Sequence, residues 1–471
     1  MKIKHSELEI SNDKPFENCV LGRENYANIL TGLIQSYSDG FVLAINNEWG
    51  TGKTTFVKMW QQSMQNKAFK TLYFNAWEND FDKSPLVAIM SELKTLFNVG
   101  KNEATFKSIA KKAALLQSKI APALIKAILA KYFDLKEFND VLEKTADAGF
   151  ELFENEITEY AEKKKGLIEF REELTKFIKD VNSGSKPLVF IIDELDRCRP
   201  DYAVELLENI KHFFNIPGIV FVLAIDKKQL GNAIRGYYGS DLIDADEYLR
   251  RFIDIEYSLP NPDTLSFCKY LYKYFAFINS PSSSRYSDSF LNLASSLFEK
   301  SNFSLRQQEK VFAHTRIVLR SLNNDTEEYF SFIFILICIK IISPEFYRKI
   351  QNKELSMQEL SDSYFDFIPK NFNINTFIDK ADDPRTRQLI FIEAQLVLYY
   401  SKFIHERASD FSQSIFLKGS KSQLTFKSKF DTSEENKELM KKFTYLNDSR
   451  LSELSIGYFL DRINLLEHSI S

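Results

Sequence analysis

The stretch "NNEWGTGKTT", residues 46–55, decides the fold of this chain. It follows the apolar run "FVLAINN", residues 41–47, which predicts a buried strand, and it leads into a helix predicted from Lys53 to about Gln65. A glycine-containing turn between a strand and a helix directs consecutive backbone N–H groups and a helix N-terminus at one point, where they bind phosphate. The stretch therefore predicts a phosphate-binding loop.

Each part of such a loop has a chemical task. The glycines permit the tight turn, the lysine contacts the β- and γ-phosphates of a nucleotide, and the following hydroxyl binds Mg²⁺. The lysine here is Lys53 and the hydroxyl belongs to Thr54. The predicted nucleotide-binding residues of the loop are Trp49, Gly50, Thr51, Gly52, Lys53, Thr54 and Thr55. Asn47 occupies the place of the usual first glycine, and because asparagine tolerates left-handed backbone angles better than most residues, the turn can survive this replacement.

A second motif, "PLVFIID" at residues 187–193, predicts a strand that ends in a carboxylate. Asp193 would then help to hold Mg²⁺, and Glu194 would orient or deprotonate the attacking water. The alternative is that the acidic pair only caps a strand, but the loop upstream favours the functional reading. The predicted catalytic residues are Lys53, Asp193 and Glu194, and the predicted metal ligands are Thr54 and Asp193.

The remaining strand signals predict an α/β fold. The runs "FKTLYFNAW" at 69–77 and "IVFVLAID" at 219–226 are apolar. Amphipathic helices follow, one of them with Ser84 and Pro85 in the N-cap and first-turn positions and another from about Pro200. Strands that are apolar on both faces and alternate with such helices indicate a parallel sheet covered on both sides.

The spacing of the two motifs predicts the domain organisation. Lys53 and Asp193 are 140 residues apart, whereas two strand–helix–strand units need roughly 60, so we expect a helical insertion between them. The predicted parts are residues 1–99 and 186–260 for the two halves of the core, 100–185 for the insertion, and 261–471 for a helical lid and an all-helical C-terminal region.

The first part of this insertion, residues 104–133, is lysine-rich and contains no acidic residue. Lys112, Lys119 and Lys126 are spaced by sevens on one predicted helix face. A solvated helix face is the favoured interpretation. Contact with anionic lipid or with nucleic acid is the alternative, and the sequence does not choose between them.

Composition excludes several other classes of protein. Among 471 residues there are 42 Phe and 21 Tyr, which indicate large packed cores, and the net charge of -4 gives no general reason to expect nucleic acid. The four cysteines have neither zinc nor disulfide spacing. The apolar run at 329–339 is closed by Lys340 and is too short for a membrane span, so it predicts a buried helix. We expect a cytoplasmic protein.

Six segments in order resemble the KAP family of P-loop NTPases, within the wider AAA+/STAND-like ATPases. They are "LGRENYA" (21–27), "NEWGTGKTTF" (47–56), "YFNAWEND" (73–80), "IIDELDRCRP" (191–200), "VFVLAID" (220–226) and "EYLRRFIDIEYSLP" (247–260). The resemblance covers roughly residues 13–320, and Asn47 departs from it. Many members of the family carry transmembrane helices where this chain has its charged insertion.

The resemblance implies roles for further residues. Arg23 would lie near the nucleotide base, and Asp226 would sense the γ-phosphate from a strand end. Arg250 or Arg251 would act as an arginine finger and Arg306 as a lid arginine, although solvated surface charges are the alternative for each. Asp196 and Arg197 would hold the site together through an ion pair or face a neighbouring subunit. Trp49 and Trp77 are expected to be packing residues.

The leading functional hypothesis is an ATPase that drives a conformational switch or motor. The chain lacks a guanine-recognition motif after residues 220–226, which favours ATP over GTP. The family resemblance makes a bacterial anti-phage defence role plausible, with a protein partner or effector subunit, and it leaves homo-oligomerisation open. A small-molecule kinase and a slow-turnover nucleotide-binding scaffold are the alternatives.

Overall fold

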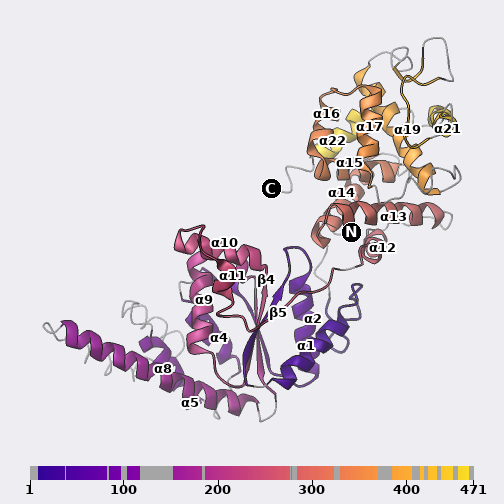
Figure 1. The fold of residues 1–471 in the computed structure, drawn as a ribbon. Coiled ribbons are helices and arrows are strands. Elements are labelled where there is room, and N and C mark those ends of the chain that lie inside the picture. Colours follow the sequence, from indigo (N-terminus) through magenta and orange to yellow (C-terminus); the bar gives the residue numbers. More distant parts are fainter. Residues whose placement is uncertain are drawn as a thin grey trace. The chain divides into compact units, whose positions relative to one another are not determined.

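The computed structural model forms two compact units, and the division between them falls after Asn261. Figure 1 shows the ribbon, and each unit is described here by itself. The residues that the structure describes are 9–37, 39–81, 84–96, 103–116, 152–182, 186–261, 263–275, 277, 284–322, 329–369, 384–405, 414–417, 423–431, 436–448 and 454–465.

A parallel sheet forms the centre of the first unit, as predicted. The strands follow the order β2-β3-β4-β1-β5. Their bounds are Phe41–Asn46 for β1, Thr71–Asn75 for β2, Leu188–Asp193 for β3, Ile219–Ile225 for β4 and Ile255–Tyr257 for β5. In the register, Asn46 lies opposite Ile225 and Asp193 opposite Ala224. The carboxyl ends of β1, β3 and β4 therefore meet at one edge, where ligands of open α/β sheets bind.

Helices cover both faces of this sheet (Figure 1). Alternate apolar residues of β1, β3 and β4 point into two separate clusters of buried side chains, one on each face. One face packs against α1 (Glu24–Ser36) and α2 (Lys53–Asn66). The other packs against α4 (Pro85–Lys94), α9 (Pro200–Phe213) and α10 (Lys227–Tyr238). Ser84 caps α4 by accepting a hydrogen bond from the N–H of Val87, and Pro85 begins that helix, as predicted.

The described part of the insertion is a pair of helices on the second face. It consists of α5 (Glu103–Leu116) and α8 (Leu152–Asn182), which contact each other through Phe106 and Phe177. Lys112 pairs with Glu169 at 2.9 Å and with Glu173 at 2.8 Å. This lysine is therefore engaged within the protein rather than on a free basic face. Lys119 and Lys126 lie outside the described residues.

The described part of the second unit is helical apart from an isolated antiparallel bridge between Phe416 and Leu424. Its helices are α12 (Thr264–Tyr274), α13 (Ser284–Lys300), α14 (Leu305–Ser321), α15 (Phe330–Ile342), α16 (Pro344–Gln351), α17 (Met357–Phe367), α19 (Pro384–Ile404), α21 (Lys437–Asp448) and α22 (Ile456–Leu465). The apolar helix α15 is buried against phenylalanines of α13 and α14, which confirms the prediction of a core helix.

Within the described ranges, no single helix has both the length and the apolar composition to cross a membrane. The helices α15 and α16 meet these criteria only as a pair, and the chain bends by 117° between them.

The short elements of the first unit complete the fold. They are α3 (Ala76–Asn79), α11 (Ala245–Leu249) and the 3₁₀ turn Leu195–Arg197.

Candidate nucleotide-binding site

The loop between β1 and α2 has the backbone that a phosphate site requires. Gly50 and Gly52 have φ of 81° and 82°, in the left-handed region that favours glycine. The turn forms with asparagine in the place of the usual first glycine, and Asn47 does not have a positive φ, so it does not use the left-handed angles that asparagine tolerates. Its side-chain amide is used instead. It donates to the carbonyl of Leu259 at 2.9 Å and accepts from the N–H of Leu259 at 2.9 Å.

Lys53 begins α2 and is buried at the mouth of the loop. Its Nζ donates hydrogen bonds to the carbonyl oxygen of Asn47 and, at 3.1 Å, to that of Glu48. Burial lowers the pKa of Lys53, while the nearby carboxylates of Asp196, Asp226 and Asp193 act in the opposite direction. A buried ammonium among carboxylates and beside a helix N-terminus is suited to bind a phosphate with associated Mg²⁺.

Arg23 supports the loop from the start of α1. Its guanidinium is buried and donates from Nη1 to the carbonyl of Gly52 at 3.1 Å and from Nη2 to the carbonyl of Thr51 at 2.7 Å. The planar fork of arginine matches two neighbouring carbonyls. Arg23 thus holds the two peptide groups that join Thr51 to Gly52 and Gly52 to Lys53. Its role beside the base stays a prediction.

Asp193 is at the end of β3, only 1% exposed, and surrounded by donors. The hydroxyl of Tyr73 donates to its Oδ2 at 2.9 Å, the N–H of Glu194 donates to its Oδ1 at 2.9 Å, and the side chain of Thr54 also bonds to it. Burial raises the pKa of Asp193, and the bonds from Thr54 and Tyr73 oppose this rise. The structure thus brings together both predicted metal ligands.

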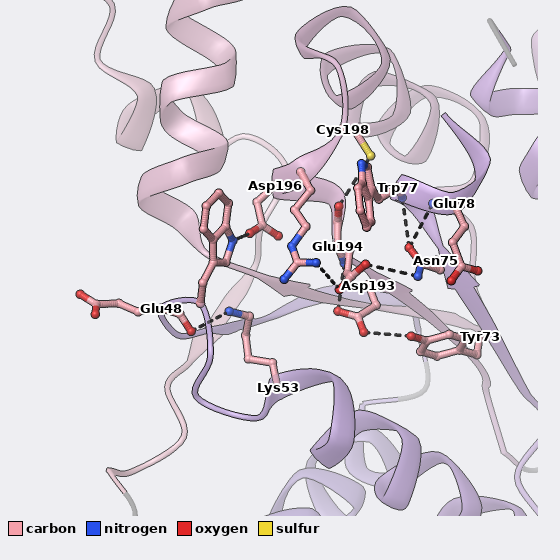
Figure 2. Close-up of polar contacts among 12 residues, drawn as sticks. Glu48, Lys53, Tyr73, Asn75, Trp77, Glu78, Asp193, Glu194, Asp196 and Cys198 are labelled. Carbon is pink, nitrogen blue, oxygen red and sulfur yellow. Dashed lines mark hydrogen bonds and ion pairs between the residues drawn. The ribbon is translucent and has the colours of Figure 1, made fainter. Parts of the chain in front are cut away.

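Glu194 follows directly and has an unusual backbone. Its φ and ψ are 61° and 24°, a left-handed conformation that costs a non-glycine residue about 1–3 kcal/mol and is concentrated at functional sites. Its Oε1 pairs with Nη1 of Arg197 at 2.9 Å, and its Oε2 accepts from Nδ2 of Asn75 at 3.3 Å. Figure 2 shows the side chains of Tyr73, Asn75, Asp193 and Glu194 around the adjoining ends of β2 and β3.

The two tryptophans beside the site are exposed, so the expectation that they are packing residues is wrong. Trp49 is 44% and Trp77 51% exposed, and the guanidinium of Arg197 lies over both rings, at 5.7 Å and 5.6 Å from the ring centroids. Nε1 of Trp49 donates to Asp196. The ion pair of Arg197 is formed with Glu194, and Asp196 bonds to the loop instead.

Comparison with known proteins places this site in a family. The sequence model of the KAP family P-loop domain matches residues 23–360, more than half of the chain. This chain belongs to the KAP family. The match includes the loop, Asp193, Glu194 and the beginning of the helical unit.

Two further similarities are local or distant. The "Uncharacterized protein MJ0182" of Methanocaldococcus jannaschii is 42% identical to this chain over 65 residues. These residues cover 14% of this chain and 32% of the Methanocaldococcus protein. The chain therefore matches about a third of the relative's length. A solved structure of the Aeropyrum pernix ORC2 protein, described as ADPNP-ADP complexes, has 12% identity and a TM-score of 0.33 and covers 81% of this chain and 75% of its own.

The other predicted residues of the KAP site fall into two groups. Asp226 caps α10 by accepting from the N–H of Gln229 at 3.2 Å, and it also accepts from the N–H of Trp49 at 3.2 Å, so it joins β4 to the loop. Thr55 lies in the first turn of α2. Arg251 is exposed, and in the described chain its guanidinium has no ion-pair partner. Arg306 belongs to the helical unit, where it is the second residue of α14.

Arg250, the other finger candidate, pairs with Glu247 at 3.1 Å on the surface, and neither arginine enters the polar cluster around Asp193. The cluster instead contains Tyr73 and Asn75, to which the sequence analysis assigned no role. The signal for Asn75 is a polar residue at the carboxyl end of a strand, because this end lies beside that of β3 in a parallel sheet.

The donor set fits a nucleotide-bound magnesium ion. Mg²⁺ in such sites takes one or two protein oxygens and completes its coordination with phosphates and water. Thr54 and Asp193 provide such oxygens beside Lys53. Among the described residues, no group of three or more His, Cys, Asp or Glu side chains could form an all-protein metal site.

Proposed function

We propose that this KAP-family protein binds ATP with Mg²⁺ and hydrolyses it. One observation carries the proposal. Thr54 of the loop and Asp193 of β3, far apart in sequence, lie close enough for the Thr54 side chain to lower the pKa of Asp193, and Lys53 and Glu194 are their neighbours in the chain. These are the groups that phosphoryl transfer to water requires, namely a phosphate cradle, two metal ligands and a carboxylate for the attacking water.

In this proposal the protein contributes positioning and charge. The backbone N–H groups of residues 50–54, supported by Arg23, bind the phosphates together with Lys53. Thr54 and Asp193 would hold a magnesium ion, whose charge would stabilise the negative charge that develops on the phosphates. Glu194 orients the water and accepts its proton. Because Glu194 pairs with Arg197, hydrolysis requires that this ion pair loosen.

The biological process is proposed from the family relationship and from the division of the chain into two units. The two units and the family relationship are consistent with a protein that uses hydrolysis as a conformational switch or motor. A role in bacterial anti-phage defence, with an effector subunit as partner, rests on the resemblance of the sequence motifs alone. ATP is preferred over GTP because no guanine-recognition motif follows β4.

Substitution of Lys53 tests the binding step. Lys53→Ala should abolish binding of MgATP in calorimetry, since it removes the buried ammonium of the loop. Lys67→Ala is a matched control, because Lys67 lies just after the same helix and its side-chain Nζ donates to Asn28 on the surface rather than to the loop. Equal ATP affinity in Lys53→Ala and Lys67→Ala would contradict the phosphate-loop assignment.

Substitution of Glu194 tests the chemical step. Glu194→Gln should retain ATP and lower its turnover by about 10²–10⁴-fold, since the amide cannot accept the proton from water. Phosphate released from ATP without an added acceptor would exclude a kinase. Turnover in the wild-type protein no faster than in Glu194→Gln would favour a nucleotide-binding scaffold.

A further inference from the structure

The residue that departs from the phosphate-loop pattern connects the loop to β5. The strands β1 and β5 pair from Leu43 opposite Ile255 to Ile45 opposite Tyr257. Two residues beyond this ladder, the side-chain amide of Asn47 exchanges two hydrogen bonds with the backbone of Leu259. The amide thus continues the strand pairing where the backbone of β1 has turned into the loop. Glycine, the usual residue here, has no group that could do this.

The backbone of Asn47 faces the other neighbour of β1. Its N–H donates to the carbonyl of Ile225, the last residue of β4, at 3.1 Å. Its carbonyl accepts from Nζ of Lys53. Asn47 therefore joins β4, the loop lysine and the segment after β5, and each of these three contacts uses a different polar group of this one residue.

The segment bound by Asn47 leads directly into the helical unit. Leu259 is buried in the apolar cluster beneath α2, where Phe56 also lies. The first unit ends at Asn261, and α12 of the second begins at Thr264. Pro260 follows Leu259 and restricts the backbone at this exit. A change in the position of Leu259 would therefore reach the start of α12 through only a few residues.

Lys53 provides the link to the nucleotide. An ammonium has three N–H donors, and the carbonyls of Asn47 and Glu48 already accept from this one. A phosphate that accepts the third N–H draws the ammonium toward itself, so it changes the hydrogen bonding of the Asn47 peptide. The side chain of that residue transfers the change to Leu259.

We propose that Asn47 is a positioning residue that couples phosphate binding at Lys53 to the segment leading from β5 into the helical unit. The inference rests on the proposed binding of ATP and specifies how the site would control the second unit. It also accounts for the asparagine in the place of the usual glycine.

Hydrogen exchange at the amide of Leu259, measured with and without saturating MgAMP-PNP, tests this coupling. In the wild-type protein the nucleotide should slow exchange by about fivefold or more, because an ordered loop strengthens the bond to Oδ1 of Asn47. Asn47→Gly should keep MgAMP-PNP affinity within about threefold, because glycine suits the loop, and should lose the exchange response. Asn47→Ser, whose hydroxyl is too short to make both bonds, is a second variant with the same expectation.

Thr51→Val is the control within the loop. The hydroxyl of Thr51 donates to the carbonyl of Glu48 at 2.8 Å and does not reach β5, so at saturating nucleotide this variant should keep the response. The coupling is wrong if the Leu259 amide of the wild-type protein is unaffected by bound nucleotide, or if both Asn47 variants respond like the wild type. Failure of MgAMP-PNP to bind the wild-type protein would instead reject the proposed function itself.

Discussion

Arg197 Nη1 lies 2.9 Å from Glu194 Oε1, while the same guanidinium lies over the rings of Trp49 and Trp77. The carboxylate that we propose to activate water is thus paired with a cation that lies over aromatic rings of the loop and of α3. A cation over two indoles makes the ion pair more rigid than a surface pair. Any movement of Glu194 toward a bound nucleotide therefore disturbs both tryptophans.

Intrinsic fluorescence should report this movement. The chain has three tryptophans, and the third, Trp60, is buried beneath α1. MgATP should change the emission of the wild-type protein, and the Trp49→Phe and Trp77→Phe variants should each lose part of that change. An undiminished change in the double variant would show that the signal arises at Trp60 and that Arg197 keeps its place.

The loop should depend on the fork geometry of Arg23. Arg23→Lys keeps the positive charge but cannot donate in parallel to the carbonyls of Thr51 and Gly52. Loss of one charge-assisted bond of about 1.5–3 kcal/mol should weaken ATP binding by about 10- to 150-fold. Calorimetric titration measures this change, and Arg235→Lys on α10, where the arginine bonds to Asn232 on the surface, is the control. Equal affinities for the two variants would refute a supporting role for Arg23.

Tyr73 should set the acid limit of activity through Asp193. Its hydrogen bond opposes the rise of the pKa of Asp193 that burial causes. In Tyr73→Phe this opposition is lost, so the pKa of Asp193 should rise further, and the carboxylate should be protonated at a higher pH. The acidic limb of the kcat/KM profile should therefore shift to higher pH, while Tyr26→Phe, outside the cluster, should leave it in place. Superimposable profiles for Tyr73→Phe and the wild type would contradict this.

The sequence predicts the strands that form the centre of the sheet because these are apolar on both faces. The structure places β1, β3 and β4 within one or two residues of the predicted bounds. By contrast, β5 has only three residues, with an exposed Glu256 in the middle, so its sequence has neither the length nor the apolar pattern of a core strand. Its ladder with β1 depends on tertiary contacts.

In the candidate site, too, local motifs could be predicted from the sequence and tertiary contacts could not. The loop and the acidic pair are local motifs, and the structure brings Lys53, Thr54, Asp193 and Glu194 together. Tyr73 reaches Asp193 only because β2 lies next to β3, and strand order cannot be read from local patterns. The contacts of the Asn47 side chain could not be predicted from the loop pattern, because its amide bonds to Leu259, a residue 212 positions later.

A buried carboxyl group connects three segments of the helical unit. Glu393 on α19 is 0% exposed, and its oxygens accept hydrogen bonds from the hydroxyls of Ser361 on α17, at 2.5 Å, and of Ser428, at 2.6 Å. Burial, with the nearby charges of Asp431 and Asp362, raises the pKa of Glu393 to about 7, and the two hydroxyl bonds only partly oppose this.

The stability of the helical unit should therefore fall as the pH rises. Between the ordinary value of 4.5 and about 7, the folded protein retains a proton on Glu393 that the unfolded chain has released. The free energy of unfolding thus decreases with pH across this window, by about 3 kcal/mol in total, and changes no further above it. Glu393→Gln, which has no proton to lose, should remove this slope in urea unfolding measured from pH 4.5 to 8.

Glu345→Gln is the matched control for this variant. Glu345 is an exposed residue of α16 that pairs with Lys349, and its amide replacement should leave the slope as it is in the wild type. A Glu393→Gln variant that loses stability between pH 4.5 and 8 as steeply as Glu345→Gln would mean that Glu393 is ionised throughout that range. The hydroxyls of Ser361 and Ser428 would then hold a carboxylate, and the proton would not contribute to the packing of α17 against α19.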